Sequence, residues 1–314
     1  MDSREPTIMS TTSQPETQRP PATVFGLRVS SEIDLPELAS VLVSSADDAD
    51  VVIRRRRLPV DESTDYGLTK RADEEYLINY RAATVVIRDG CIIDVDPSQS
   101  TPDEIVRHVI LGPAMHHLLH QRGRFILHAS TVDFDGRAVA FLGESGQGKT
   151  TMAAACLLAG QRVMSDDVAA IEFVDRDPVV RSGYPAIKLH DSFVERFNPP
   201  VQNPVRTCDR RDRHFYGLQH DQPTEPIPLE RVYFLTDGDH EAIEPVEPAR
   251  RLALLAMQTY AAGLLHHPDE ADTNFRWCSR LLEDVVVNRL VRRRRFDRLP
   301  DIVRLVESDL DGSS

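Results

Sequence analysis

The chain has 314 residues, of which 41% are hydrophobic, so it can bury a large core in one or two domains. Its 37 basic and 50 acidic residues leave a formal charge of −13, which argues against general nucleic-acid binding because that affinity needs excess Lys and Arg. We find no signal-peptide pattern and no apolar run of the roughly 18–20 residues that a membrane span needs, so no membrane partner is expected.

The N-terminal third is predicted to be a tail followed by a sheet. Residues 1–21 are rich in Ser, Thr, Gln and Pro, which is typical of a disordered segment. Asp89 and Gly90 predict a hairpin turn, and the basic run 54–57 is interpreted as a charged strand end rather than an anion site. Alternating or β-branched runs predict a small antiparallel sheet with strands at 23–29, 50–54, 75–80, 84–88 and 91–95.

One helix is predicted to complete an N-terminal α+β domain over residues 22–121. Thr101 suits the N-cap, Pro102 suits the first turn, and Glu104 completes a capping box. Apolar residues continue at helical spacing until Gly123, which is expected to end the helix. We favour surface and packing roles over a metal site for its four histidines, because no Cys or Asp joins them at a ligand spacing. These are His108, His116, His117 and His120.

A phosphate-loop motif occupies residues 143–150, with the sequence GESGQGKT, inside a second predicted domain over 122–310. It matches G-x-x-x-x-G-K-[ST] at every fixed position. Its glycines allow backbone N–H groups to turn toward phosphates, Lys149 can reach the β- and γ-phosphates, and the Thr150 hydroxyl can hold Mg²⁺. The motif therefore predicts binding of ATP and Mg²⁺. The residues predicted to contact the nucleotide are Gly143, Glu144, Ser145, Gly146, Gln147, Gly148, Lys149, Thr150 and Thr151.

The segments on either side of this loop favour the same prediction. Residues 137–142 form a short apolar run that predicts a buried strand. Residues 151–158 predict a helix that Gly160 ends. The alternative is a glycine-rich turn that matches the motif by chance, and the strand–loop–helix context disfavours it.

Two neighbouring carboxylates follow the loop at the distance of one crossover. Residues 162–171 predict a strand that contains Asp166 and Asp167. If this strand runs parallel to 137–142, both aspartates lie near the loop, at the sheet edge where open α/β folds bind ligands. A carboxylate there holds Mg²⁺ or accepts a proton from an attacking hydroxyl. A solvated turn or a helix cap is the alternative.

The remaining sequence predicts a further series of strands and helices. The proline-rich residues 198–228 predict a long irregular connection, in which Arg211 and Arg213 are candidates to contact a transferred phosphoryl group; a mobile charged loop is the alternative. Lys188 is an exposed strand lysine or an anion contact, and the arginine run 292–295 is interpreted as a solvated strand end. Strands are predicted at 183–189, 229–235 and 285–290, and helices at 248–265, 275–284 and 299–310.

Three segments taken together resemble a known family: Leu127-His128-Ala129-Ser130, the loop 143–150, and Ser165-Asp166-Asp167. They resemble the catalytic core of HPr kinase/phosphorylase, and most of the chain is similar to kinases of this type found beside lasso-peptide biosynthesis genes. The resemblance implies an α/β fold in which a P-loop kinase core, like the C-terminal domain of HPr kinase, follows a small strand-rich α+β domain. It also implies a serine of a peptide or small protein as the acceptor, and an active-site role for His128. The family's Glu-bearing signature, which serves the reverse reaction, is not found, so phosphorylase activity is not carried over.

The predicted function is transfer of the γ-phosphate of ATP to a hydroxyl. Lys149 is assigned to stabilise the transferred charge, Asp166 to act as general base, and Thr150 with Asp167 to hold Mg²⁺. A nucleotide-binding regulatory or scaffold module and a small-molecule kinase stay open, because a phosphate loop by itself predicts binding and not transfer. Four scattered cysteines without C-x-x-C spacing favour a cytoplasmic location, and a homo-oligomer is a further open possibility.

Overall fold

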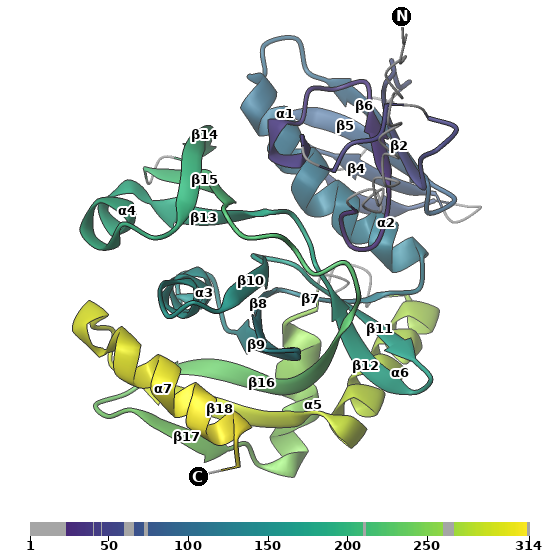
Figure 1. The fold of residues 1–314 in the computed structure, drawn as a ribbon. Helices are drawn as coiled ribbons and strands as arrows, with labels where there is room; N and C mark the ends of the chain where they lie inside the picture. The colour runs from purple at the N-terminus through teal and green to yellow at the C-terminus, as the bar shows by residue number, and fades with distance from the viewer. Residues whose placement is uncertain are drawn as a thin grey trace, which may run out of the picture.

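The computed structural model of the protein describes residues 23–312, apart from 40, 45, 60–65, 72–74, 210–211 and 260–266. The predicted tail at 1–21 and the candidate Arg211 lie outside the described residues. Within the described ranges, no helix is both long and apolar enough to cross a lipid bilayer. The chain is a mixed α/β structure, in which the N-terminal elements, purple to blue, pack together at one end of the molecule (Figure 1).

The N-terminal sheet is mixed, whereas the sequence predicts an antiparallel one. In the described residues it has six strands in the order β1-β2-β6-β5-β4-β3. The pair β1–β2 is parallel because the chain between these strands leaves the sheet and returns. β2 and β6 are also parallel, because the chain after β2 crosses to the opposite edge of the sheet and comes back through β3, β4 and β5 to β6. The predicted hairpin between β5 and β6 is confirmed, and both turn residues, Asp89 and Gly90, have the positive φ of a type I′ turn. The strands are β1 (Val29–Ser31), β2 (Val51–Arg55), β3 (Gly67–Lys70), β4 (Tyr76–Asn79), β5 (Ala83–Arg88) and β6 (Ile92–Pro97).

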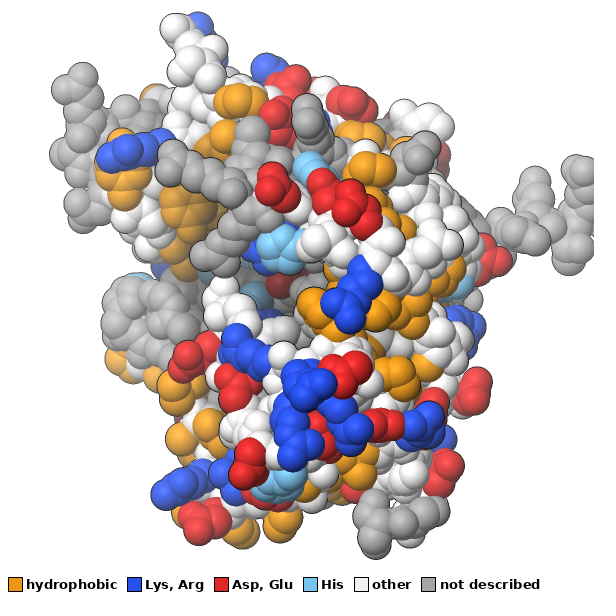
Figure 2. Space-filling view, turned by 90° about the vertical axis from the view of Figure 1, so that its left-hand side faces the viewer, with side chains coloured by type: hydrophobic (Ala, Val, Ile, Leu, Met, Phe, Trp, Pro, Cys, Tyr) orange, Lys and Arg blue, Asp and Glu red, His pale blue; other side chains and the backbone are white. Residues whose placement is uncertain are grey.

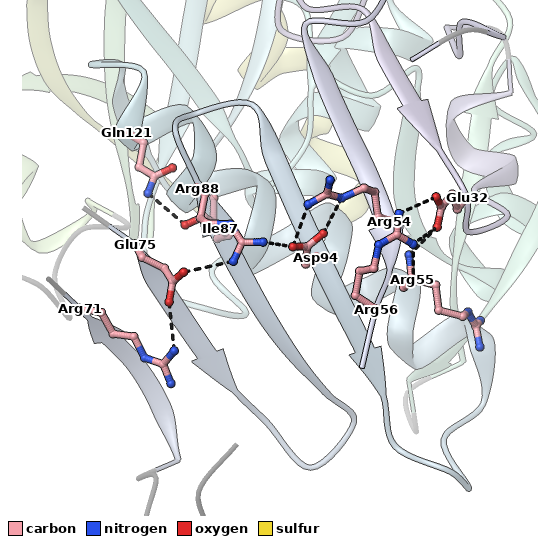
Figure 3. A network of polar contacts seen from close by, with 10 residues as sticks. All are labelled: Glu32, Arg54, Arg55, Arg56, Arg71, Glu75, Ile87, Arg88, Asp94 and Gln121. Carbon is pink, nitrogen blue, oxygen red and sulfur yellow. Dashed lines mark hydrogen bonds and ion pairs between the residues drawn. The ribbon is translucent and has the colours of Figure 1, made fainter. Parts of the chain in front are cut away.

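A row of ion pairs crosses this sheet and accounts for the start of the basic run 54–57 (Figure 3). Asp94 is 2% exposed, and its carboxylate accepts hydrogen bonds from Arg54 at 2.7 and 3.0 Å and a further one from Arg88. Arg88 also bonds Glu75 at 3.2 Å. Arg54 thus compensates a buried carboxylate on the neighbouring strand, in agreement with a charged strand position rather than a ligand site.

Replacing Asp94 by Ala is expected to lower the free energy of unfolding by about 1.5–3 kcal/mol, the range for hydrogen bonds to charged groups. The variant loses these charge-assisted bonds and leaves two arginines side by side, although both are partly exposed and regain water. Urea unfolding measures the change. The control is Asp272→Ala, which removes an exposed ion pair with Arg276 and should cost about 0–1 kcal/mol. Equal losses in both variants would contradict the prediction.

The predicted single helix between 101 and 123 is broken in the middle. It consists of α1 (Asp103–Val109), a π turn (Ile110–Ala114) and α2 (Met115–Gln121). Pro113 cannot donate a helical hydrogen bond, and Gly112 takes up the distortion with φ −93° and ψ −105°. The predicted capping box is wrong, because Pro102 occupies the N-cap and no side-chain hydrogen bond caps the helix.

Two histidines of α2, His117 and His120, contact Tyr76 of the N-terminal sheet. His116 and His117 are buried, and the His117 ring meets the edge of Tyr76 with centroids 5.7 Å apart. His120 faces Glu270 at 3.3 Å, and Lys70 bonds the same carboxylate at 2.6 Å. These contacts join the N-terminal sheet to a helix near the C-terminus, as packing roles require.

Acidification is expected to destabilise the protein through His117. Burial lowers the pKa of His117 to about 4. An unfolded histidine titrates near 6.5, so between pH about 6.5 and 4 the unfolded state binds more protons and stability falls as pH falls, by at most about 1.4 kcal/mol per pH unit for one group. Urea unfolding at pH 7.5, 6 and 5 should therefore show a shallower pH dependence for His117→Leu than for the parent chain. An unchanged slope would contradict this.

The large sheet has nine strands in the described residues, with the order β10-β8-β9-β16-β12-β11-β7 and with β18 pairing both β16 and β17. The predicted buried strand is present as β9, which is parallel to β16. Its residues alternate between two apolar layers, because Val139 and Phe141 face one side and Ala138, Ala140 and Leu142 the other. The strands are β7 (Phe125–Leu127), β8 (Ala129–Phe134), β9 (Arg137–Leu142), β10 (Arg162–Ser165), β11 (Ala169–Val174), β12 (Asp177–Arg181), β16 (Ile227–Asp237), β17 (Ala242–Pro245) and β18 (Val286–Arg292).

Helices cover both faces of this sheet (Figure 1). On one face lie α3 (Lys149–Leu158) and α7 (Leu299–Leu310). On the other lie α5 (Pro248–Met257) and α6 (Pro268–Asp284). Helix α6 begins earlier than predicted, because Pro268 suits the first turn and Asp269 and Glu270 follow there. The predicted end of α5 falls partly in 260–266, outside the described residues.

The predicted irregular connection at 198–228 is wrong, because much of it forms strands. β14 (Val201–Asp209) and β15 (Arg213–Leu218) make a three-stranded sheet with β13 (Ala186–His190) in the described chain, next to α4 (Asp191–Phe197). Proline does not exclude a strand here, since Pro204 lies in β14 at the edge of this sheet, where a missing N–H is tolerated.

Candidate functional site

The loop 143–150 connects β9 to α3, so the strand and helix predicted around the motif are both present. Its glycines are required by conformation and by space. Gly148 has φ 85°, and a Cβ there would lie 2.8 Å from the Arg292 guanidinium. Gly143 has φ 152°, and a Cβ there would lie 2.6 Å from Oε1 of Gln147. Side chains at these positions would therefore disturb the loop on which phosphate binding depends.

Lys149 is buried at the start of α3 and folds over its own loop. Its Nζ donates hydrogen bonds to the carbonyl oxygens of Gly143 at 2.8 Å and Glu144 at 3.4 Å. Burial lowers the pKa of Lys149, while Asp167 and Asp166 act in the opposite direction. The cation thus lies inside the loop, between the loop backbone and the carboxylate pair.

Asp166 and Asp167 lie near the loop, but the strands that place them there differ from the predicted ones. The predicted strand 162–171 is two strands, β10 and β11, with Asp166 and Asp167 in the bend between them. β10 does not pair with β9; both pair antiparallel with β8, which lies between them. Two antiparallel steps restore the same direction, so the end of β10 lies at the same sheet edge as the end of β9.

Asp166 is buried and accepts hydrogen bonds from three elements. Ser130 Oγ donates at 2.6 Å, Thr150 Oγ1 at 2.9 Å, and the backbone N–H of Lys188 at 3.1 Å. Burial and then the neighbouring Asp167 raise the pKa of Asp166, and the three hydrogen bonds oppose that rise. The carboxylate is therefore held firmly against the threonine of the motif.

Asp167 is less enclosed and has the left-handed backbone conformation, with φ 69°. Nδ1 of His128 lies 3.1 Å from its carbonyl oxygen, and the His128 backbone N–H donates to Gln258 O at 2.7 Å. Burial and then the Lys149 cation lower the pKa of His128, which favours the neutral imidazole. The structure thus brings together the predicted residues His128, Lys149, Thr150, Asp166 and Asp167.

Two cavities share His128 and Asp167 as lining residues. The first has a volume of about 340 Å³ and is lined by the motif loop, by Lys188 and Arg213, and by the aromatic residues Phe193 and Phe296. The second has a volume of about 280 Å³ and lies against the π turn between α1 and α2. Figure 2 shows the surface hollowed near the middle of one face, with histidine and basic side chains at the edge of the hollow.

The first cavity contains residues that the motif analysis misses. Phe193 and Phe296 line it with ring centroids 5.9 Å apart. Nζ of Lys188 lies 5.7 Å from the Phe215 ring, so this lysine belongs to the site rather than to an open surface. The aromatic pair carries no short motif and comes from distant segments, so no local signal identifies it.

Arg292 corrects the interpretation of the arginine run as wholly solvated. It is 6% exposed and donates a hydrogen bond to the carbonyl oxygen of Gln147 in the motif loop, and burial lowers its pKa. Arg293, Arg294 and Arg295 are exposed, as predicted. The difference arises because Arg292 is the last residue of β18 and still belongs to the sheet.

The donor set suits Mg²⁺, which prefers oxygen ligands and in nucleotide sites commonly takes one or two carboxylates besides phosphates and water. The Thr150 hydroxyl and the Asp166 carboxylate provide such oxygens in direct contact, at 2.9 Å. Among the residues that the structure describes, no group of three or more His, Cys, Asp or Glu side chains forms a metal cage. A cation at this position would therefore need the phosphates of a nucleotide as additional ligands.

Comparison with known proteins gives one solved structure of interest. No family model and no curated protein matches the chain. The fold is similar to the HPr(Ser) kinase/phosphatase from Coxiella burnetii, with 13% identity over 60% of this chain and 99% of that one, at a TM-score of 0.31. At this low identity and TM-score, the likeness assigns no residue role and no activity to this chain. The function is therefore argued from the geometry of the site.

Proposed function

We propose that the protein is an ATP-dependent kinase that transfers the γ-phosphoryl group to a hydroxyl, with a serine of a peptide or small protein as acceptor. One observation carries the proposal: the motif loop and the Asp166–Asp167 pair meet at one sheet edge, where two cavities share Asp167 and His128. A nucleotide-binding module needs the first cavity and the loop. It has no need of a carboxylate between that cavity and a second one.

The first cavity suits the nucleotide. The loop N–H groups and Lys149 would bind the phosphates, and the purine would lie against Phe193 and Phe296, which also line this cavity. Thr150 and Asp166 would hold Mg²⁺, which when bound neutralises charge on the phosphates. Arg292 would stabilise the loop by its hydrogen bond to the carbonyl oxygen of Gln147.

For the general base, the geometry favours Asp167 over the Asp166 that motif order predicts. The Asp166 carboxylate is occupied by three donors and lies against Thr150, which suits a metal-side ligand. Asp167 borders both cavities, so an acceptor in the second cavity could reach it beside the γ-phosphate. We therefore exchange the two roles, with His128 positioning Asp167 through its backbone carbonyl.

The proposed step balances without a further reactant. The acceptor oxygen forms a bond to the γ-phosphorus, and its proton passes to the Asp167 carboxylate. The bond from the γ-phosphorus to the bridging oxygen breaks, and ADP leaves with the electron pair. Lys149 stabilises the charge on the transferred group. Free thiols at Cys91, Cys156 and Cys278 fit our further proposal that this reaction takes place in a reducing cytoplasm.

The test is transfer of label from γ-³²P-ATP, with Mg²⁺, to serine-containing peptides, alongside calorimetric titration of Mg-ATP. We expect both binding and transfer, and we expect loss of transfer when EDTA removes the cation. Binding without transfer to any peptide, protein or small hydroxyl compound would instead identify a regulatory nucleotide-binding module. Absence of ATP binding would exclude both functions.

A further inference from the structure

We propose that the second cavity, defined above by its position against the π turn, binds an apolar side chain next to the acceptor hydroxyl. The protein would then select serines that have a large aliphatic or aromatic neighbour in the sequence. This inference rests on the proposed kinase function and specifies the substrate of that same site.

The position of the cavity assigns it to the acceptor and not to ATP. The motif loop lines the first cavity and does not line the second. Between them stand His128 and Asp167, with Lys149, the residue expected at the γ-phosphate, close to this pair. A group in the second cavity thus approaches the γ-phosphate from the side opposite the loop, which is where an attacking hydroxyl must lie for in-line transfer.

The walls of the cavity are mainly apolar. Leu111, Val168 and Phe215 contribute aliphatic and aromatic surface. The Tyr184 hydroxyl donates a hydrogen bond to the Leu111 carbonyl oxygen at 2.7 Å, so the aromatic ring is the part of Tyr184 that a bound side chain would contact. Glu37 also lines the cavity, but its carboxylate accepts a hydrogen bond from Arg107 at 3.0 Å. His108, His116 and His128 also line the cavity, and burial lowers the pKa of His116 and His128, which favours neutral rings over cations. An acidic or strongly hydrated side chain would therefore lose water here for little electrostatic gain, whereas an apolar one gains by burial.

The broken helix shapes this space. Gly112 and Pro113 line the cavity at the π turn, and a Cβ added to Gly112 would meet no atom within 4 Å. A volume of about 280 Å³ is at the small end for ligand pockets, and suits one or two side chains rather than a folded domain. The distortion that Pro113 imposes on the helix therefore places backbone atoms and apolar surface in the same cavity as His128 and Asp167.

The experiment uses the full chain and two series of blocked hexapeptides, Gly-Gly-X-Ser-Gly-Gly and Gly-Gly-Ser-X-Gly-Gly, with X as Leu, Phe, Asp or Lys. Peptide binding is measured with Mg-AMP-PNP present, and transfer is measured with γ-³²P-ATP. In at least one series, Leu or Phe should exceed Asp by about tenfold or more, the discrimination expected of an apolar pocket. Equal binding of all peptides, or none, overturns the inference even if transfer to other acceptors shows that the protein is a kinase.

Ala186→Leu tests the cavity directly, because Ala186 lines its wall. The added bulk should abolish most of the preference for apolar X. The control Ala249→Leu makes the same change at an exposed position of α5 and should keep the preference. If Ala186→Leu does not fold, Phe215→Ala replaces it and should shift the preference from Leu toward Phe by enlarging the space. A tenfold loss of Mg-ATP affinity with unchanged peptide preference would place the purine in this cavity and overturn the inference.

Discussion

Lys149→Ala should reduce phosphoryl transfer by about 10²–10³-fold, the usual effect of removing one preorganised electrostatic donor. The ammonium is buried within the loop, 2.8 Å from the Gly143 carbonyl and beside the carboxylate pair. Arg292 cannot take its place without moving, because its guanidinium is bonded to the carbonyl oxygen of Gln147. ATP affinity should also fall, since the same charge faces the β- and γ-phosphates in the ground state.

Single-turnover transfer and calorimetric titration of Mg-ATP measure the two effects separately. Arg293→Ala serves as the control, because it removes an exposed cation that directly follows Arg292, the residue in contact with the loop, and it should change neither quantity. Circular dichroism verifies that both variants fold. Transfer by Lys149→Ala at the parent rate would refute the assignment of the loop as the phosphate site.

Asp167→Asn should lower transfer by about 10²–10⁴-fold while Mg-ATP still binds, because the amide keeps the shape of the side chain and loses its basicity. Asp166→Asn should act differently. It leaves Thr150 without the carboxylate that it now contacts at 2.9 Å, so Mg-ATP affinity should fall and a higher Mg²⁺ concentration should recover part of the activity. The two aspartates are adjacent, so each variant is the natural control for the other.

The assay titrates Mg²⁺ at fixed ATP for both variants and compares transfer at saturation. If Asp166→Asn binds Mg-ATP normally and loses transfer, while Asp167→Asn loses the cation dependence, then the roles predicted from motif order are correct and our exchange is wrong. If neither variant affects transfer, the carboxylate pair is not part of the chemistry. The Asp167 variant also separates a kinase from a binding module, which the Lys149 variant alone does not do.

Features that depend only on neighbouring residues could be predicted from the sequence. The motif with its strand and helix, and the Asp89–Gly90 hairpin, are local: glycine spacing, apolar runs and turn residues determine them within about ten positions. For the same reason the predicted roles of Lys149 and Thr150 require no knowledge of the sheet order.

Features that depend on contacts between distant segments follow only from the folded structure. β8 lies between β9 and β10, so Asp166 reaches Thr150 although the two strands do not pair. The burial of Arg292 depends on β18 ending beside the loop, which a run of four arginines conceals in the sequence. Likewise, only packing of the broken helix against β13 and β15 creates the apolar cavity beside Asp167. Burial, long-range pairing and hydrogen-bond partners are properties of the folded chain, and our exchange of the two aspartate roles rests on them.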